Sequence, residues 1–254
     1  MLIYGHRGAK GEAPENTLAG FEHAYRHGVR RFEMDIQLSA DGVPVVVHDL
    51  TVDRTTEKQG KIASFSAAEL DQMDARRGGP PWRTPVGIPR LDAVFESCPA
   101  FEHMQLEVKT DSWQRLNSLC NRLVELVQQR RWQSRIILTS SDERFLQAVK
   151  RRDAQIRIGL VAERRYPNPV KTATSLGCDY LCLRWTLCKA ETVLAAHNQG
   201  LHVSAWTVNR IHDMLELEAQ GVDSIITDYP TSTRTYFESR TQIGPLTLTG
   251  AEQH

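Results

Sequence analysis

The sequence predicts an α/β fold, a TIM-type (β/α)8 barrel with a small insertion after the second strand. Eight short apolar runs are separated from one another by segments of helical pattern, and polar residues stand at the ends of several runs. The runs begin at Leu2, Phe32, Met104, Arg135, Ile156, Tyr180, Val203 and Ser224. TIM barrels carry their sites at the carboxyl ends of such strands. An open doubly wound sheet is the alternative, but no Gly-rich dinucleotide fingerprint follows the first run.

The first run ends at Gly5, and the glycines at positions 5 and 8 allow the chain to turn tightly there. A helix is predicted over residues 17–27, with Asn16 or Thr17 as its cap and Gly28 at its end. The second strand follows over residues 32–38. Because only about four residues then separate it from the β-branched run 43–48, these two runs are predicted to form an antiparallel hairpin.

Residues 50–89 are predicted to form the insertion, because glycine and proline are frequent there and only residues 67–73 show a helical pattern. The alternation of helix and strand then becomes regular. Helices are expected over residues 89–98, 113–130, 142–152, 170–176, 190–199 and 211–220, and strands over 104–109, 135–139, 156–162, 180–183, 203–208 and 224–227. We expect residues 1–254 to be a single domain with a loose tail from about residue 241.

Composition excludes several classes of partner. Thirty-one basic and thirty-one acidic residues give a net charge of zero and a pI near 7.1, so no global field favours nucleic acid or an anionic membrane. No apolar run approaches the roughly 20 residues of a spanning helix, so stable membrane insertion is not expected. Five cysteines without a C-x-x-C pair predict reduced thiols and neither a disulfide framework nor a zinc site. The chain opens on a strand and not on a basic, apolar leader, and we expect a cytoplasmic protein.

Carboxylates mark the ends of two predicted strands. Glu33 and Asp35 are two residues apart in one strand and therefore project to the same face. Glu107 occupies the corresponding place on the next strand of the barrel. Buried carboxylates repel one another unless a cation or a shared proton lies between them, and three oxygen ligands suit one divalent cation, Mg²⁺ or Ca²⁺. The alternative is that Glu33 and Asp35 form ion pairs with Arg30 and Arg31.

Cations and histidines stand at the same strand ends. Arg7 and Lys109 are the local positive charges that an anionic substrate would need. His6 and His48 could serve as an acid and a base, since imidazole titrates near neutral pH. Each has an alternative interpretation: the histidines could be structural, Lys109 could pair with a neighbouring carboxylate, and Trp206 could belong to the core. Their concurrence at separate strand ends favours a site. The insertion residues 53, 54 and 57 are interpreted as structural or loop-ordering.

Ordered motifs make the sequence resemble the glycerophosphodiester phosphodiesterase family over nearly its whole length. The matches are H-R-G at 6–8, P-E-N-T at 14–17, E-M-D at 33–35, H-D at 48–49, D-R-T-T at 53–56, I-P-R-L at 88–91, E-V-K at 107–109, A-W-T-V-N at 205–209 and I-T-D-Y-P at 226–230. The resemblance implies a TIM barrel with a small insertion after its second strand. It also implies hydrolysis of glycerophosphodiesters, which are deacylated phospholipid head groups, to glycerol 3-phosphate and an alcohol.

The resemblance also implies roles for particular residues. The expected divalent-metal ligands are Glu33, Asp35 and Glu107, and the expected acid and base are His6 and His48. The expected substrate-binding residues are Arg7 and Lys109 on the phosphate, Trp206 on the glycerol, and Glu15 and Asn16. The expected partner is a small-molecule glycerophosphodiester. The oligomeric state is left open, a homodimer being one option.

Two other functions are weighed against this one. A barrel phospholipase or sphingomyelinase acting on intact lipid would need an apolar docking surface, and the insertion offers only Phe65 and Trp82. A non-catalytic phosphodiester-binding protein would ordinarily lack a histidine or a metal carboxylate, and neither is lost. The residues leave open which histidine is the acid, and whether water or the 2-hydroxyl of the glycerol attacks.

Overall fold

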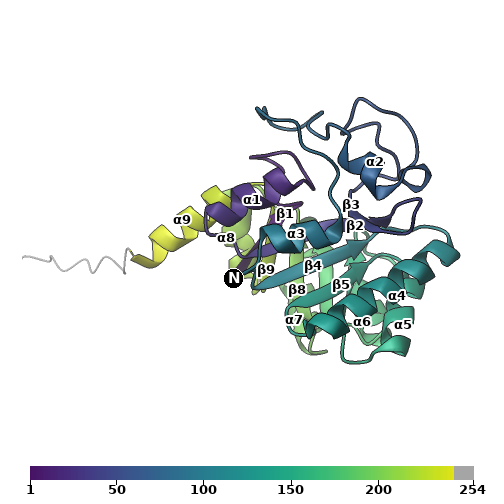
Figure 1. Cartoon of the computed structure of the whole chain (residues 1–254). Helices are drawn as coiled ribbons and strands as arrows, with labels where there is room; N and C mark the ends of the chain where they lie inside the picture. The colour runs from purple at the N-terminus through teal and green to yellow at the C-terminus, as the bar shows by residue number, and fades with distance from the viewer. Residues whose placement is uncertain (243–254) are drawn as a thin grey trace, which may run out of the picture.

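A computed structural model describes residues 1–242 and shows a closed barrel of parallel strands (Figure 1). Going round the barrel, β1 pairs with β2 and with β9, so the sheet closes on itself. The barrel strands are β1 (Leu2–His6), β2 (Arg31–Leu38), β4 (His103–Val108), β5 (Ile136–Ser140), β6 (Arg157–Ala162), β7 (Tyr180–Arg184), β8 (His202–Trp206) and β9 (Ser224–Thr227). The predicted TIM barrel is confirmed, and no strand boundary differs from the prediction by more than two residues.

Helices follow the barrel strands as the sequence pattern predicts. They are α1 (Leu18–Arg26), α2 (Ala67–Asp71), α3 (Leu91–Ser97), α4 (Trp113–Arg130), α5 (Glu143–Arg152), α6 (Pro169–Ser175), α7 (Ala190–His197), α8 (Ile211–Ala219) and α9 (Pro230–Gln242), with 3-10 turns η1 (Ile62–Ser64) and η2 (Trp185–Leu187). Helix α9 was not predicted, because its many threonines, serines and arginines show no apolar periodicity. The remainder of the expected loose tail, residues 243–254, lies outside the described residues.

The predicted hairpin is present. Strand β3 (Pro44–Val46) pairs antiparallel with β2, and Ile36 lies opposite Val46. The buried side-chain amide of Gln37 then donates to the carbonyl oxygens of three successive residues, at 3.1 Å to Val47, 3.0 Å to His48 and 2.6 Å to Asp49. The segment that carries His48 is thus attached to β2 beyond the point where the hairpin ladder ends.

The insertion begins after this segment and has a small apolar core of its own. In Figure 1 its loops and α2 lie beyond the end of β2 and β3. Its buried apolar residues include Val52, Ile62, Leu70, Met73 and Ile88. Helix α2 starts with a capping box, in which Ser66 and Glu69 satisfy each other's backbone N–H groups. The insertion is therefore an ordered structure attached to the edge of the barrel where polar residues gather.

Alternation along the strands separates the main core from the site. Met34 and Leu106 are fully buried in the large apolar cluster that includes the inner faces of the surrounding helices. Their neighbours in sequence point the other way, into the barrel. The strand register brings these inward residues together, because His6 lies opposite Glu33 and Asp35 lies opposite Glu107. The polar strand ends of the sequence therefore meet at one mouth.

Two further expectations were drawn from composition. All five cysteines are free, and four of them are buried, as expected of packed thiols. Among residues 1–242, no helix has both the length and the apolar character that a membrane crossing requires.

The opposite end of the barrel is closed by aromatic and imidazole rings. His103 stacks on Tyr180 with an interplanar angle of 11°, and Tyr180 stacks on His202 at a centroid distance of 4.1 Å. The ring of His103 is buried, with Nδ1 3.0 Å from the Tyr4 hydroxyl and Nε2 3.2 Å from Nη2 of Arg157. Burial, together with the charge of Arg157, lowers the pKa of His103 to about 3. This histidine is therefore neutral in the fold at neutral pH.

A neutral buried histidine makes stability depend on pH. Between pH 6.5 and about 3 the unfolded chain binds a proton at His103 that the fold excludes, so the free energy of unfolding should fall as pH falls, by at most about 1.4 kcal/mol per pH unit from this group. Arg157, Arg31 and His202 face the ring and oppose its charging. In urea unfolding measured from pH 7 to pH 4, the free energy of unfolding of His103→Gln should therefore fall less steeply with falling pH than that of the wild type. A slope equal to that of the wild type, or equal flattening by His212→Gln at an exposed position, would contradict this.

Candidate metal and acid–base site

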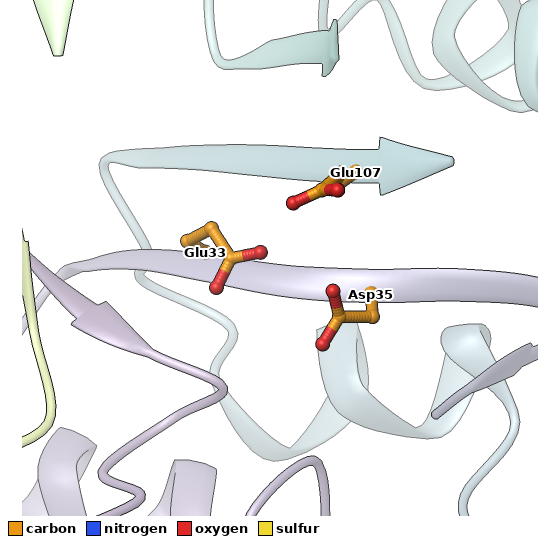
Figure 2. A group of neighbouring side chains, drawn as sticks. All are labelled: Glu33, Asp35 and Glu107. Atoms are coloured by element: carbon orange, nitrogen blue, oxygen red, sulfur yellow. The ribbon is translucent and has the colours of Figure 1, made fainter. Parts of the chain in front are cut away.

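Three carboxylates from two neighbouring strands converge at the barrel mouth. Glu33 and Asp35 come from β2 and Glu107 from β4, and one oxygen atom from each lies within 4.8 Å of the others. Figure 2 shows the three side chains turned toward one another. Glu33 and Asp35 are 4% and 1% exposed. The structure therefore brings together the three residues that the sequence suggested as metal ligands.

The two cations beside this cluster, Lys109 and Arg7, both contact Asp35. Nζ of Lys109 lies 2.8 Å from Oδ1 of Asp35 and 2.5 Å from Oε1 of Glu107, and Nε of Arg7 lies 3.0 Å from Oδ2 of Asp35. Burial alone would raise the pKa of Asp35, but Lys109 and Arg7 outweigh it and hold that pKa below its usual range. Arg31 does not pair with Glu33 or Asp35, because it forms an ion pair with Glu102 at 2.5 Å.

Glu33 is left without comparable compensation. Its Oε2 accepts a hydrogen bond of 3.3 Å from the backbone N–H of Arg7, while its Oε1 is buried and has no hydrogen-bond partner among residues 1–242. Burial, and then the charges of Asp35 and Glu107, raise the pKa of Glu33 well above its usual value. A buried carboxylate with a bare oxygen beside two others is what a hard divalent cation would stabilise. The residues present therefore fit such an ion.

His6 is fixed from behind by a carboxylate. Its Nδ1 lies 2.5 Å from Oδ1 of Asp228, and Oδ2 of Asp228 accepts a 2.7 Å hydrogen bond from the side-chain amide of Asn209. Burial lowers the pKa of His6, although Asp228 opposes this effect. A carboxylate at Nδ1 favours the tautomer that carries its proton there. Nε2, which lies 3.9 Å from Oε2 of Glu33, is then the ring atom that faces the carboxylate cluster.

His48 repeats this arrangement. Its Nδ1 lies 2.6 Å from Oδ1 of Asp49, the next residue in the chain. Its side chain is 35% exposed, so it is more accessible than that of His6, which is 10% exposed. Each of the two histidines thus has one ring nitrogen held by an aspartate and the other free to exchange a proton.

Arg7 lies in a turn with an uncommon backbone conformation. Its φ angle of 50° is in the left-handed region, which few residues other than glycine adopt. Nη1 of Arg7 donates a 2.8 Å hydrogen bond to Oε1 of Glu15, and the amide of Asn16 donates a 2.8 Å hydrogen bond to Oδ2 of Asp35. Glu15 and Asn16 are therefore placed behind Arg7 and Asp35.

One cavity of about 590 Å³ opens over this group. Among its lining residues are the predicted site residues His6, Arg7, Glu33, His48, Glu107, Lys109 and Trp206. The indole N–H of Trp206 donates a 3.0 Å hydrogen bond to the carbonyl of Cys182, which fixes the ring against the wall. The cavity thus combines cations, acid–base groups and clustered carboxylates, a set suited to reactions at an anionic centre.

Four supporting residues received no role from the sequence, or only a structural one. They are Asp228 and Asn209 behind His6, Asp49 behind His48, and Arg54, which contacts Asp49 and Glu15. A signal existed for three of them, because Asp49 follows His48 directly and the other two lie just after the ends of β9 and β8. Arg54 had no such signal, since nothing in its position relative to the strands links it to residue 15.

Comparison with known proteins gives consistent matches. The family model described as "Glycerophosphoryl diester phosphodiesterase family" matches residues 6–232. A glycerophosphodiester phosphodiesterase of Caldanaerobacter subterraneus subsp. tengcongensis is 31% identical over 230 residues, which is 90% of this chain and 94% of that protein. The structure of an Oleispira antarctica phosphodiesterase, in complex with the product sn-glycerol-3-phosphate, has a TM-score of 0.81 at 26% identity and covers 94% of this chain and 97% of that one. A Silicibacter pomeroyi structure has a TM-score of 0.85 at 26% identity, covering 94% of each chain.

The crowding of the buried Glu33 carboxylate by Asp35 and Glu107 can be tested without measuring catalysis. Glu33→Gln removes one of three crowded carboxylates, so the EDTA-treated variant should unfold at a higher temperature than EDTA-treated wild type. Mg²⁺ or Ca²⁺ should stabilise the wild type, by about 2.7 kcal/mol at a free concentration 100 times Kd, and should stabilise the variant much less. Calorimetric unfolding with and without the ion measures both effects.

Glu102→Gln is the matched control, because Glu102 is an exposed carboxylate outside the cluster. Its response to the ion should equal that of the wild type. An undiminished response in Glu33→Gln would show that the ion binds elsewhere.

Proposed function

The chain belongs to the glycerophosphoryl diester phosphodiesterase family, and on that premise we propose that it hydrolyses glycerophosphodiesters to glycerol 3-phosphate and an alcohol, using the site described above. The observation that carries the proposal is one cavity lined by two cations, by two histidines that each contact an aspartate, and by Glu33 and Glu107 of the three-carboxylate cluster. Hydrolysis of a phosphodiester needs positive charge near the phosphate oxygens, a base for the nucleophile and an acid for the leaving alcohol.

The proposed cofactor is one divalent cation, Mg²⁺ or Ca²⁺, held by Glu33, Asp35 and Glu107. When bound, such an ion offsets the negative charge of phosphoryl oxygens and polarises the phosphorus centre. Carboxylate oxygens are the ligands that both ions prefer. The unpartnered, buried Oε1 of Glu33 supports this assignment from within the fold.

Arg7 and Lys109 are proposed to bind the phosphate. Lys109 has three N–H donors, and two acceptors, on Asp35 and Glu107, are already close to its nitrogen, so one donor remains for an anion. Arg7 retains donors on its outer guanidinium nitrogens after its contact with Glu15. The adjacent carboxylates fix both cations in place before substrate arrives, which lowers the entropic cost of binding it. Glu15 and Asn16, proposed as substrate-binding residues from the sequence, would then act through Arg7 and Asp35.

His6 and His48 are proposed as the acid–base pair. The aspartate at Nδ1 of each ring leaves Nε2 as the atom that takes or gives a proton. One histidine would accept the proton of the nucleophile, and the other would donate a proton to the departing alkoxide. Trp206 would offer its ring, fixed against the cavity wall, to the carbon face of the glycerol.

A small substrate fits better than an intact lipid. Phe65 packs against the apolar core of the insertion, and Trp82 contacts the ring of His23 edge-on at 6.0 Å. These two aromatic residues, the insertion's only candidates for a lipid-docking surface in the sequence, are therefore used within the protein. A cytoplasmic location remains a prediction from the sequence.

The first test is release of product. Purified protein should release glycerol 3-phosphate from glycerophosphocholine, measured with a coupled dehydrogenase assay. EDTA should abolish the release, because without the ion the negative carboxylate cluster would repel the phosphate. Addition of Mg²⁺ or Ca²⁺ to the dialysed protein should restore it. Activity that survives exhaustive chelation would exclude the proposed cofactor, and absence of activity on any glycerophosphodiester would exclude the proposed reaction.

The second test separates the two histidines. His6→Ala and His48→Ala should each lower kcat by about 10²- to 10⁴-fold, the usual effect of removing one positioned acid or base. An activated phenolate leaves without being protonated. A substrate with such a leaving group should therefore restore the rate of the variant that lacks the acid, and should not restore the rate of the variant that lacks the base. His212→Ala, at an exposed position, is the control. If both variants fail equally on both substrates, the histidines do not divide the proton transfers.

A further inference from the structure

Arg54 joins two carboxylates that belong to different parts of the chain. Its Nη1 and Nη2 donate hydrogen bonds of 2.9 and 2.7 Å to the two oxygens of Glu15, and its Nε donates one of 2.5 Å to Oδ2 of Asp49. The planar guanidinium is suited to this task because its five N–H groups point outward in a fixed fork. Glu15 precedes α1, whereas Asp49 and Arg54 lie where the insertion begins.

Each of the two carboxylates also holds a residue of the proposed machinery. Oε1 of Glu15 accepts the 2.8 Å hydrogen bond from Arg7, and Oδ1 of Asp49 lies 2.6 Å from Nδ1 of His48. Direct contacts therefore run without interruption from the phosphate-binding arginine, through Arg54, to one of the two acid–base histidines.

Arg54 itself does not line the cavity, and its side chain is 44% exposed. The side chain of Glu15, by contrast, is only 10% exposed. Burial would raise the pKa of Glu15, but hydrogen bonding to Arg54 and the charge of Arg7 hold it below its usual value. Without Arg54, the carboxylates of Glu15 and Asp49 would lose the hydrogen bonds that fix their orientation, and these same carboxylates contact Arg7 and His48. Loss of Arg54 would therefore displace the two groups that the reaction uses.

We infer that Arg54 is a positioning residue of the active site: by bridging Glu15 and Asp49 it sets the orientation of Arg7 and His48 together, and so makes the insertion a part of the catalytic centre. The inference rests on the proposed function for its kinetic consequence and on contacts alone for its structural one. An arginine that merely fastened the insertion to the barrel would affect folding stability and leave the His48 ring undisturbed.

Kinetics provide the first measurement. Arg54→Ala should lower kcat for glycerophosphocholine by about 10- to 100-fold, the usual effect of losing a residue that orients a site ligand. Arg54→Lys should recover only part of the lost kcat, because its single ammonium group keeps the positive charge but cannot bridge both carboxylates as the guanidinium does. Millimolar ethylguanidinium should restore Arg54→Ala several-fold by occupying the same place.

Arg76→Ala is the matched control. Arg76 also lies in the insertion and also pairs with an aspartate, with Nη2 2.6 Å from Oδ2 of Asp74, but it contacts neither Glu15 nor Asp49. Its kcat should stay within about twofold of the wild-type value. An equal loss in Arg54→Ala and Arg76→Ala would show that only the folding of the insertion matters, and the inference would be overturned.

A second measurement needs no activity and so separates this inference from the proposed reaction. In ¹⁵N-histidine NMR spectra, with rings assigned from His6→Gln and His48→Gln, Arg54→Ala should shift the imidazole signals of His48 and leave those of His6, which is held by Asp228, in place. Unchanged His48 signals would overturn the inference whatever the kinetics show. If the wild type cleaved no glycerophosphodiester, the proposed function would fail, and this spectrum alone would decide the role of Arg54.

Discussion

The arrangement of the site depends on how the buried carboxylate of Asp35 is stabilised. A carboxylate that is 1% exposed is costly unless it is paired, and Asp35 is contacted by Lys109 at 2.8 Å, the amide of Asn16 at 2.8 Å and Arg7 at 3.0 Å. These three come from the residue after β4, from the turn before α1 and from the turn after β1. One buried charge therefore draws three segments together. Because both nearby cations pair with Asp35, Glu33 has no cation in direct contact among the described residues. A further cation would therefore stabilise the cluster.

The two histidines reach this cluster by different routes. His6 is the last residue of β1, and its height in the barrel is fixed by parallel pairing with β2. His48 lies beyond the short β3 strand, where the amide of Gln37 takes over from the hairpin ladder. His6 lies within the closed sheet, whereas the His48 segment is joined to β2 by the 2.9 Å backbone hydrogen bond from Val47 to Asp35 and by the side-chain contacts of Gln37. Residues outside the barrel can therefore influence the second histidine more readily than the first.

Much of this could be predicted from the sequence. Strand count, the alternation that places Glu33 and Asp35 on one face, and the short connection before residue 43 are local signals with direct geometric consequences. Helix α9 could not be predicted, because its sequence lacks a periodic apolar pattern, although its Phe237 packs against the main core. The contact of Arg54 with Glu15 could not be predicted either, since it joins residues 39 positions apart through long side chains whose rotamers depend on the assembled fold. The position of Asp228 just after β9 does indicate the barrel mouth, but its contact with His6, which is 222 positions away, could not be predicted.

The proposed function requires a divalent ion that Glu33, Asp35 and Glu107 would bind beside the substrate phosphate. The most direct measurement is a crystal structure of the protein grown with Mn²⁺ and glycerol 3-phosphate, with diffraction data collected at the manganese absorption edge. A single anomalous peak should lie among the three carboxylates, within bonding distance of the phosphate, with Arg7 and Lys109 on the other phosphate oxygens. An anomalous peak elsewhere, or a phosphate bound in the cavity with no ion on these carboxylates, would contradict the account.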